Sequence, residues 1–233
     1  MKKLVIIPTF NECENIEALV RDIFAKNQNL NVLVVDDNSP DGTAAIVEKL
    51  ISEEFPEKLH ILNRPGKQGL GRAYIAGFHW ALENSFDAVI EMDADFSHRV
   101  EDLVKISQAI ESSDAVVGSR YIPGGSVANW TWYRKLISLG GSLYSTMILW
   151  RRLKDWTGGF NAYRKEVLQD IGLDQINSEG YSFQIELKYR TLKKGFKLVE
   201  VPIRFEDRRG GQSKMGMKIF VEALYRVWKI RFT

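Results

Sequence analysis

The stretch NVLVVDDNSPDGT at residues 31–43 decides the class of fold. It begins with a run of apolar and β-branched residues, which favours a strand, and it ends in two aspartates and a polar turn. Because the apolar run is continuous rather than alternating, both faces of this strand should be covered, as in a parallel sheet flanked by helices. The polar residues that follow lie where open parallel sheets bind their ligands.

The same arrangement repeats on either side of this stretch. Four further apolar runs predict strands at residues 3–10, 58–64, 88–93 and 115–120. Amphipathic patterns between them predict helices at residues 14–26, 42–53, 70–83 and 101–111. This alternation of strands and helices predicts an α/β fold with a mostly parallel central sheet.

The second half of the chain is less regular. Helices are predicted at residues 133–150 and 180–195, a loop at 155–164, a strand at 196–205, and an amphipathic helix at 215–231. We find no repeat, low-complexity segment or linker, so a single domain over residues 1–233 is expected.

Composition narrows the class of protein. The chain has 233 residues, of which 45% are hydrophobic and 27% charged, as in an ordinary globular enzyme or binding protein. Its single cysteine, Cys13, cannot form an internal disulfide, which favours a reducing, cytoplasmic compartment. The N-terminal residues do not have the pattern of a secretory signal. The longest weakly polar run, at residues 137–150, is shorter than the roughly 20 residues that a membrane-spanning helix needs.

Charge is unevenly distributed along the chain. The net charge is only +2, yet eight basic and three acidic residues follow position 203. A basic C-terminal region favours an anionic partner, which we take to be a phosphate or a lipid surface, while a solvated helix face is the simpler alternative. Nucleic acid is disfavoured because the basic groups lie in loops beside an acidic site.

Each of the five predicted strands in the first half ends in polar residues. These ends read PTFNE, DDNSPDGT, NRPGKQGLGRA, DADFSH and GSRY. A dinucleotide site would need G-x-G-x-x-G after the first strand, and that motif is missing there. A nucleotide base and ribose contacting Asp36 or Asp37 is still expected.

Asp93 and Asp95 follow the fourth predicted strand. Residues two apart on an extended segment point the same way, so both carboxylates should face one site. Two hard oxygen ligands suit Mg²⁺ or Mn²⁺ shared with substrate phosphates. The alternative is a helix cap with a solvated neighbour. His98 is a candidate base, although a hydrogen bond within the loop explains it equally well.

Several basic residues flank glycine-rich or loop segments rather than lying only on helix faces. They are Arg120, Arg134, Arg208, Arg209 and Lys214. Arginine binds phosphate with two parallel hydrogen bonds, and lysine acts as a point charge. A carboxylate site for one phosphate group and a separate basic site for another indicate two phosphorylated partners.

Together these motifs identify a resemblance that runs nearly end to end. The chain resembles the dolichyl-phosphate (polyprenyl-phosphate) mannosyltransferases, which are family 2 glycosyltransferases with the GT-A fold. The matching segments are IPTFNE, VVDDNSPDGT, NRPGKQGLGRAY, MDADFSH, GSRY, DWTGGFNAYRKEVL, GYSFQIEL and VPIRFEDRRGGQSKM.

The resemblance implies roles for individual positions. It assigns nucleotide contacts to Pro8, Phe10, Glu12, Asp36, Asp37 and Lys67. It implies that Asp93 and Asp95 bind the divalent cation and the GDP diphosphate, and that Arg120, the third catalytic residue, lies near the diphosphate and the acceptor. It assigns the lipid phosphate to Arg134, Arg208, Ser213 and Lys214. Residues 1–122 would form the nucleotide-binding half, and residues 123–233 the acceptor-binding half.

The implied reaction is transfer of mannose from GDP-mannose to a polyprenyl phosphate, with inversion at the anomeric carbon. A phosphate monoester is mostly dianionic at pH 7, so this nucleophile needs almost no deprotonation. Aromatic residues with basic neighbours at residues 130–152 favour peripheral contact with the cytoplasmic face of a membrane.

Two other functions remain open at this point. The first is transfer from a UDP-sugar, such as UDP-glucose, to polyprenyl phosphate or to a glycan hydroxyl. A hydroxyl acceptor would need a carboxylate base, for which Asp155 and Glu186 are candidates. The second is a non-catalytic subunit that binds nucleotide or lipid phosphate. The presence of both Asp93 and Asp95 makes this interpretation less favoured.

Overall fold

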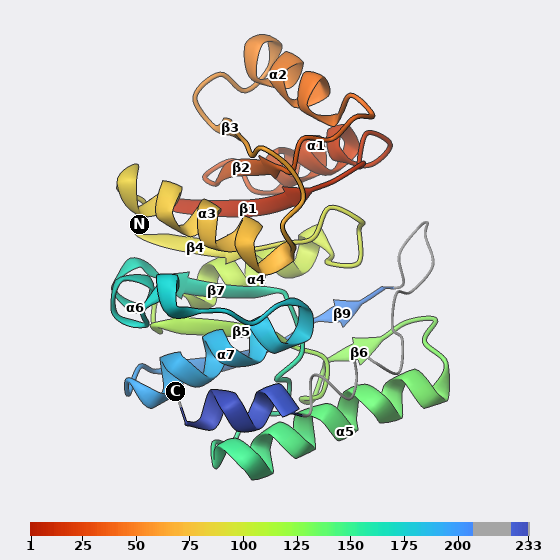
Figure 1. The fold of residues 1–233 in the computed structure, drawn as a ribbon. Coiled ribbons are helices and arrows are strands. Elements are labelled where there is room, and N and C mark those ends of the chain that lie inside the picture. Colours follow the sequence, from red (N-terminus) through yellow and green to blue (C-terminus); the bar gives the residue numbers. More distant parts are fainter. Residues whose placement is uncertain (207–224, 233) are drawn as a thin grey trace.

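A seven-stranded sheet forms the centre of the computed structural model, which describes residues 1–206 and 225–232 (Figure 1). The strands of this sheet are β1 (Lys3–Thr9), β2 (Asn31–Asp36), β3 (Leu59–Asn63), β4 (Ala88–Glu91), β5 (Ala115–Ser119), β7 (Asn161–Arg164) and β8 (Leu198–Pro202). A separate two-stranded sheet consists of β6 (Ser126–Val127) and β9 (Arg204–Phe205). The expected α/β architecture with a mostly parallel sheet is confirmed.

The strand order in the large sheet is β3-β2-β1-β4-β7-β5-β8. All pairs are parallel except those of β7, which runs antiparallel to both β4 and β5. The prediction of a loop over residues 155–164 was therefore wrong at its C-terminal end, where β7 lies. The segment NAYR lacks a run of β-branched residues, and its pairing with two neighbouring strands forms the strand instead.

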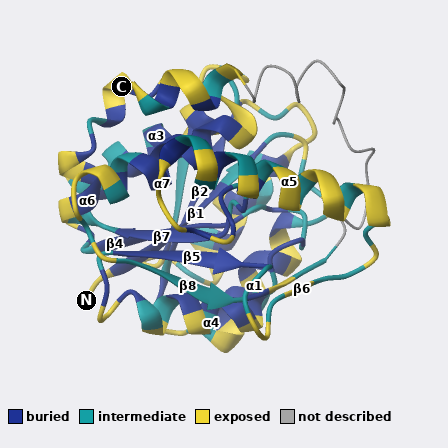
Figure 2. Ribbon diagram, turned by 90° about the horizontal axis from the view of Figure 1, so that it is seen from below, coloured by how far each residue is buried: buried dark blue, intermediate teal, exposed yellow. Residues whose placement is uncertain are grey.

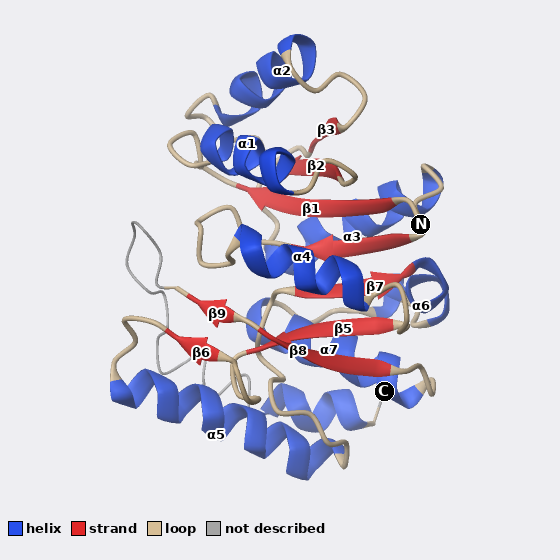
Figure 3. Ribbon diagram, turned by 180° about the vertical axis from the view of Figure 1, so that it is seen from behind, coloured by secondary structure: helices blue, strands red, loops and turns tan. Residues whose placement is uncertain are grey.

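Helices cover both faces of the large sheet. They are α1 (Ile16–Lys26), α2 (Thr43–Glu53), α3 (Leu70–Glu83), α4 (Val100–Ala109), α5 (Trp132–Leu149), α6 (Lys165–Asp170) and α7 (Gly180–Lys193), with a short 3₁₀ helix at Leu173–Gln175. Figure 3 shows α1 and α4 in front of the sheet, and Figure 1, the opposite view, shows α3 and α7 in front.

Alternating residues of the strands supply the two cores. Val5 and Ile7 of β1 pack with α1 and α4 on one face, whereas Leu4 and Ile6 pack with α3 and α7 on the other. All four side chains are fully buried. Because both faces are covered, the strands can be apolar throughout, which is why their sequence shows no alternation.

Residues 225–231 are helical. This segment and α5 lie outside the two main layers (Figure 1). Val227 and Ile230 are buried in a third apolar cluster with Leu149 and Trp156, so the described end of the chain packs against the domain. Much of α5 is exposed, as its yellow segments in Figure 2 show. Of the helices in the described part of the chain, none combines the length and apolar character needed to cross a bilayer.

Candidate active site

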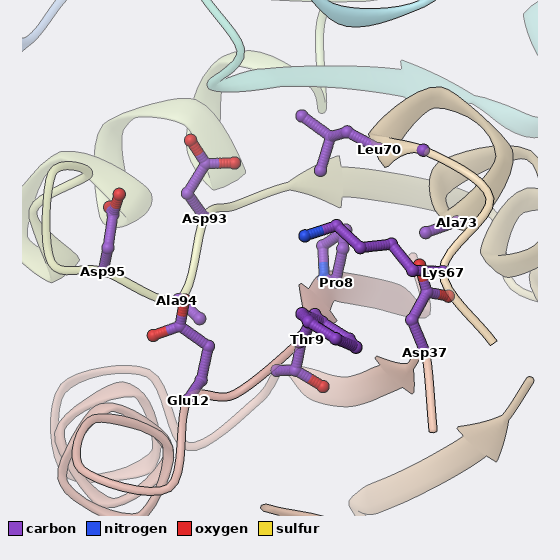
Figure 4. A pocket seen from close by; sticks show the side chains of 12 residues that line it. Pro8, Thr9, Glu12, Asp37, Lys67, Leu70, Ala73, Asp93, Ala94 and Asp95 are labelled. Atoms are coloured by element: carbon purple, nitrogen blue, oxygen red, sulfur yellow. The ribbon is translucent and has the colours of Figure 1, made fainter. Parts of the chain in front are cut away.

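A cavity of about 230 Å³ opens at the carboxyl ends of β1, β2 and β4 (Figure 4). The strand register brings these ends together, because Thr9 at the end of β1 lies beside Asp36 at the end of β2, and β4 pairs with the other edge of β1. The lining residues are Pro8, Thr9, Phe10, Glu12, Asp37, Lys67, Gly69, Leu70, Ala73, Asp93, Ala94 and Asp95. The cavity therefore lies at the edge of the sheet where ligand binding was predicted.

Asp93 and Asp95 both line this cavity, just beyond the end of β4 (Figure 4). The hydroxyl of Tyr74 on α3 donates a hydrogen bond to Asp93 Oδ1 at 3.2 Å. The backbone N–H of Ser97 donates to Asp95 Oδ1 at 3.0 Å. These hydrogen bonds help to fix both carboxylates, which line the cavity together.

The donor set fits a cation that is shared with a substrate. Among the described residues there is no group of three or more His, Cys, Asp or Glu side chains able to hold a metal ion. Two carboxylates are too few for a cation held by protein alone, but Mg²⁺ and Mn²⁺ are commonly bound by one or two carboxylates plus substrate phosphates and water. Asp93 and Asp95 are the residues that would hold such an ion.

His98 is buried beside Asp93 and does not line the cavity. Its Nδ1 accepts a hydrogen bond from the backbone N–H of Asp93 at 3.0 Å. Its ring stacks on Phe160 at 4.6 Å and meets Phe205 edge-on at 5.6 Å. Of the two interpretations of His98, the structure favours a hydrogen bond within the loop, and a base at this position has no support.

Most of the predicted nucleotide contacts line the same cavity. They are Pro8, Phe10, Glu12, Asp37 and Lys67. Figure 4 shows Glu12 beside Ala94, and Asp37 and Lys67 farther from the two carboxylates. The ammonium group of Lys67 lies 4.2 Å from the centroid of the Phe10 ring, so cation–π attraction holds its charge over the cavity.

Asp37 and Asp36 have different surroundings, although they are neighbours in sequence. Asp37 forms an ion pair with Arg64, and burial raises its pKa against the opposing effect of that guanidinium. Asp36 is buried and does not line the cavity. Its carboxylate accepts hydrogen bonds from Thr9 Oγ1 at 2.8 Å and from the backbone N–H of Ser39 at 2.8 Å. Asp36 therefore shapes the turn, and Asp37 faces the ligand space.

Arg120 lies outside the cavity lining, in a buried ion pair with Asp155. Its Nε and Nη2 donate to the two oxygens of Asp155, each at 2.7 Å, and Nη2 also donates to Thr157 Oγ1 at 2.8 Å. Burial alone would raise the pKa of Asp155, but the charge and hydrogen bonds of Arg120 lower it to about 2. Asp155 is thus an ionised partner of Arg120, which leaves it unsuited to serve as a general base.

Glu186, the other candidate base, is also committed elsewhere. It lies on α7, is buried, and forms an ion pair with Arg190 at 2.7 Å. Neither Glu186 nor Asp155 lines the cavity.

The predicted lipid-phosphate residues are described only in part. Arg134 lies in the first turn of α5, where its guanidinium is 4.2 Å from the centroid of the Trp130 ring. Arg208, Ser213 and Lys214 lie outside the described residues. The guanidinium of Arg120 is 5.3 Å from the centroid of the same ring, so both arginines contact Trp130.

A buried polar network lies behind the site, and sequence reasoning missed it. Lys188 on α7 is fully buried and donates to the backbone carbonyls of Asp155, Trp156 and Gly158. Glu91 accepts hydrogen bonds from the side-chain amide of Asn161 at 2.8 Å and from that of Gln184. Burial raises the pKa of Glu91 and lowers that of Lys188. The network fixes the segment that carries Asp155.

Arg64 and Tyr74 are two further site residues without a decisive sequence signal. Tyr74 is fully buried at a helical spacing that is usual for core residues. Arg64 directly follows β3, and its position at the end of a strand is the one sequence feature that indicates a site residue.

A mostly parallel sheet with paired carboxylates beyond β4 and a cavity at its carboxyl edge is the arrangement of a GT-A-type transferase. Residues 4–172 match the family model described as glycosyl transferase family 2. The chain belongs to this family and is a glycosyltransferase.

Similar proteins and structures support the same classification. The chain is 44% identical over 233 residues to a polyprenol monophosphomannose synthase of Mycolicibacterium smegmatis, covering 99% of this chain and 88% of the relative. It is 45% identical over 227 residues to an undecaprenyl-phosphate mannosyltransferase of Micrococcus luteus, covering 97% and 93%. A dolichol-phosphate mannosyltransferase of Pyrococcus furiosus is 40% identical over 235 residues, covering 99% of this chain and 64% of the relative.

Solved structures with little sequence identity share the fold. A glucosyl-3-phosphoglycerate synthase of Mycobacterium tuberculosis, solved with Mn²⁺, UDP and glucosyl-3-phosphoglycerate, has a TM-score of 0.68 and 15% identity, covering 98% of this chain and 78% of that structure. A mannosyltransferase of Pyrobaculum calidifontis, solved with GDP-Man and Mn²⁺, has a TM-score of 0.62 and 16% identity, covering 98% and 69%. The predicted GT-A fold is therefore confirmed.

Proposed function

We propose that the enzyme transfers mannose from GDP-mannose to a polyprenyl phosphate, giving polyprenyl-phosphate mannose and GDP. The observation that carries this proposal is that a pair of carboxylates and a pair of arginines lie at different places. Asp93 and Asp95 line the cavity, whereas Arg120 and Arg134 lie outside its lining, and each contacts the Trp130 ring. The names of the relatives at 40–45% identity support a polyprenyl-phosphate acceptor and a mannosyl group.

On this proposal, the donor occupies the cavity at the carboxyl ends of β1, β2 and β4, in the half of the chain at residues 1–122. Phe10, Asp37 and Lys67 contact the nucleotide, and Asp93 and Asp95 hold the diphosphate end through Mg²⁺ or Mn²⁺. When bound, the cation neutralises the negative charge that develops on the leaving diphosphate. The GDP-Man and Mn²⁺ complex of the structurally similar mannosyltransferase is in keeping with this assignment.

The acceptor phosphate lies beside Arg120 and Arg134. Residues 123–233 form the acceptor-binding half, and Arg120 contributes to it from the other half. A phosphate monoester has a second pKa of about 6, so at pH 7 its oxygen is already ionised and attacks without a general base. Cationic side chains offset the repulsion between the two anionic substrates. A single displacement at the anomeric carbon inverts its configuration.

Transfer to a glycan hydroxyl is less well supported by the geometry. That reaction needs a base, and the two candidates, Asp155 and Glu186, are both paired with arginines away from the cavity. A phosphate acceptor needs neither residue as a base.

A donor screen tests the proposed substrates. With one polyprenyl phosphate and Mg²⁺ or Mn²⁺ present, we expect transfer from GDP-mannose and almost none from UDP-glucose. Adding EDTA should reduce the rate to background, and an excess of the cation should restore it. Transfer from UDP-sugars but not from GDP-mannose would refute the donor, and a full rate in EDTA would refute the metal.

We also propose that α5 contacts a membrane surface peripherally, on the cytoplasmic face. Large hydrophobic side chains are exposed along it and just beyond its end: Trp132, Tyr133, Leu136, Ile137, Leu139, Leu143, Met147 and Trp150. Residues 115–154 contain no acidic residue, and basic residues lie near both ends of this helix. Exposed aromatic residues with basic neighbours suit an anionic lipid surface.

Flotation with liposomes tests this contact. The protein should float with vesicles that contain anionic lipid, and replacing both Trp132 and Trp150 by serine should leave most of it in the soluble fraction. The two tryptophans are 74% and 79% exposed, so these substitutions should not disturb the core. Wild-type protein that stays wholly in the soluble fraction would contradict the proposed contact.

A further inference from the structure

Two turns meet beside the cavity, and side chains of one turn hold the backbone of the other. The first turn, at residues 10–13, carries Phe10 and Glu12, which line the cavity. Glu12 is labelled in Figure 4. The second turn, at residues 37–43, leads from β2 into α2. The contact between the two turns therefore decides where the first turn lies along the cavity.

Three successive backbone N–H groups of the first turn donate to side chains of the second. The N–H of Asn11 donates to Ser39 Oγ, that of Glu12 to Thr43 Oγ1 and that of Cys13 to Asp41 Oδ2, each at 3.0 Å. Asn11 has a φ of 62°, in the left-handed region that residues other than glycine adopt at a cost. Such a backbone conformation persists where the surrounding structure holds it, which is what these bonds do.

Thr43 is the central side chain of this contact. It begins α2 and is fully buried. Its hydroxyl donates to Asp41 Oδ1 at 2.6 Å and accepts from the Glu12 N–H at 3.0 Å. A hydroxyl has one proton and two lone pairs. Because the proton points to Asp41, a lone pair is left to face Glu12.

Asp41 fixes the direction of the Thr43 hydroxyl. Partial burial of the carboxylate acts to raise its pKa, but hydrogen bonds from Thr43 and Cys13 lower it to about 2. At neutral pH the carboxylate is ionised and can only accept hydrogen bonds. Its Oδ1 also accepts from the backbone N–H of Thr43 at 3.1 Å, and its Oδ2 accepts from that of Cys13. Both oxygens thus hold the contact between the turns.

We propose that Thr43, oriented by Asp41, is a positioning residue for the nucleoside diphosphate of the donor, because it holds the Glu12 backbone and so keeps the first turn in place along the cavity. This inference rests on the proposed function, since it assumes that the donor nucleotide occupies this cavity. Thr43 does not line the cavity and acts through Glu12. The two carboxylates beyond β4 are held by other groups, so donor binding should weaken without a loss in the chemical step.

Calorimetric titration with GDP in the presence of Mg²⁺ measures this role. Thr43→Val keeps the shape of the side chain but leaves the Glu12 N–H without its acceptor, so the dissociation constant for GDP should rise about fivefold. Thr43→Ser keeps the hydroxyl and should bind GDP within about twofold of the wild type. Thr191→Val is the control, because Thr191 on α7 is also fully buried and its hydroxyl donates to the Leu187 carbonyl, outside the cavity lining. Its affinity for GDP should match that of the wild type.

Asp41→Asn is a second variant, and it leaves the core untouched because Asp41 is exposed. Asparagine has an acceptor at only one of the two oxygen positions, so its amide NH₂ faces a donor of either Thr43 or Cys13. The dissociation constant for GDP should again rise about fivefold.

Initial rates with GDP-mannose and a polyprenyl phosphate separate binding from chemistry. In Thr43→Val the KM for the donor should rise as the dissociation constant does, while kcat and the KM for the acceptor stay within about twofold of the wild type. Unchanged GDP binding in Thr43→Val and Asp41→Asn would overturn the inference, as would an equal loss in Thr43→Ser or Thr191→Val, or a fall in kcat without a change in the donor KM. Wild-type protein that does not bind GDP would overturn the proposed donor itself, and the inference with it.

Discussion

Replacing Asp95 by asparagine is expected to lower kcat by about a thousandfold while leaving the fold intact. Asparagine has nearly the same shape, and its amide oxygen can still accept the hydrogen bond from the Ser97 N–H. The change removes one of the two negative charges that would hold a divalent cation at the cavity wall. The leaving diphosphate then loses the cation that offsets its charge.

Initial rates with GDP-mannose and a polyprenyl phosphate measure this effect. Asp170→Asn is a suitable control, because Asp170 is an exposed carboxylate on α6 that pairs with Lys194 and lies outside the cavity lining. Its kcat should match that of the wild type. If Asp95→Asn keeps full activity, then Asp95 does not bind the metal.

Replacing Asp155 by asparagine is expected to lower the free energy of unfolding by about 3 kcal/mol and to reduce activity at the same time. The side chains of Asp155 and Arg120 are 0% and 4% exposed, so the variant would leave a buried guanidinium without its counter-charge. Chemical denaturation measures the loss of stability. Asp87→Asn is the control, because Asp87 and Lys165 form an ion pair between two partly exposed side chains. It should lower the free energy of unfolding by less than about 1 kcal/mol.

Replacing both partners separates stability from activity. The double variant Arg120→Met with Asp155→Leu removes both charges of the pair, so it should regain part of the lost stability but not the activity. The recovery is incomplete because Asp155 also accepts from the backbone N–H groups of Arg120 and Gly158. Recovery of activity in this variant would contradict a role for Arg120 in the reaction. A stability of Asp155→Asn equal to that of the wild type would show that the ion pair is not important for folding.

The pH dependence of this ion pair has a defined sign. The folded-state pKa of Asp155 is lowered to about 2 from an ordinary value of 3.8. Its contribution to stability is therefore fully present above the ordinary value and is lost as the pH falls through about 2. At neutral pH the pair is intact.

The first five strands could be predicted from the sequence because each contains a run of apolar residues. β1, β2, β4 and β5 are buried on both faces, whereas β3 is a partly exposed edge strand. The strand β7 could not, because its role depends on partners far away in the chain. Asn161 is buried and donates to Glu91 and Gln184, 70 and 23 positions away. Read alone, asparagine after two glycines indicates a loop.

The carboxylate wall of the site was also predictable, since Asp93 and Asp95 follow an apolar strand directly. The pairing of Arg120 with Asp155, 35 positions apart, was not. Each residue has a separate functional interpretation in the sequence, one as an anion-binding group and the other as a base. Only the packing of β5 against the segment after α5 shows that they neutralise each other.

The most direct test of the account is to identify the product made from GDP-mannose and a polyprenyl phosphate. We expect a lipid-extractable product in which mannose is joined through the phosphate, with the anomeric configuration opposite to that in the donor. Mass spectrometry and the coupling constants of the anomeric carbon decide both points. A product with retained configuration would contradict the single displacement. Mannose on a hydroxyl group, or no lipid-linked mannose, would contradict the central claim.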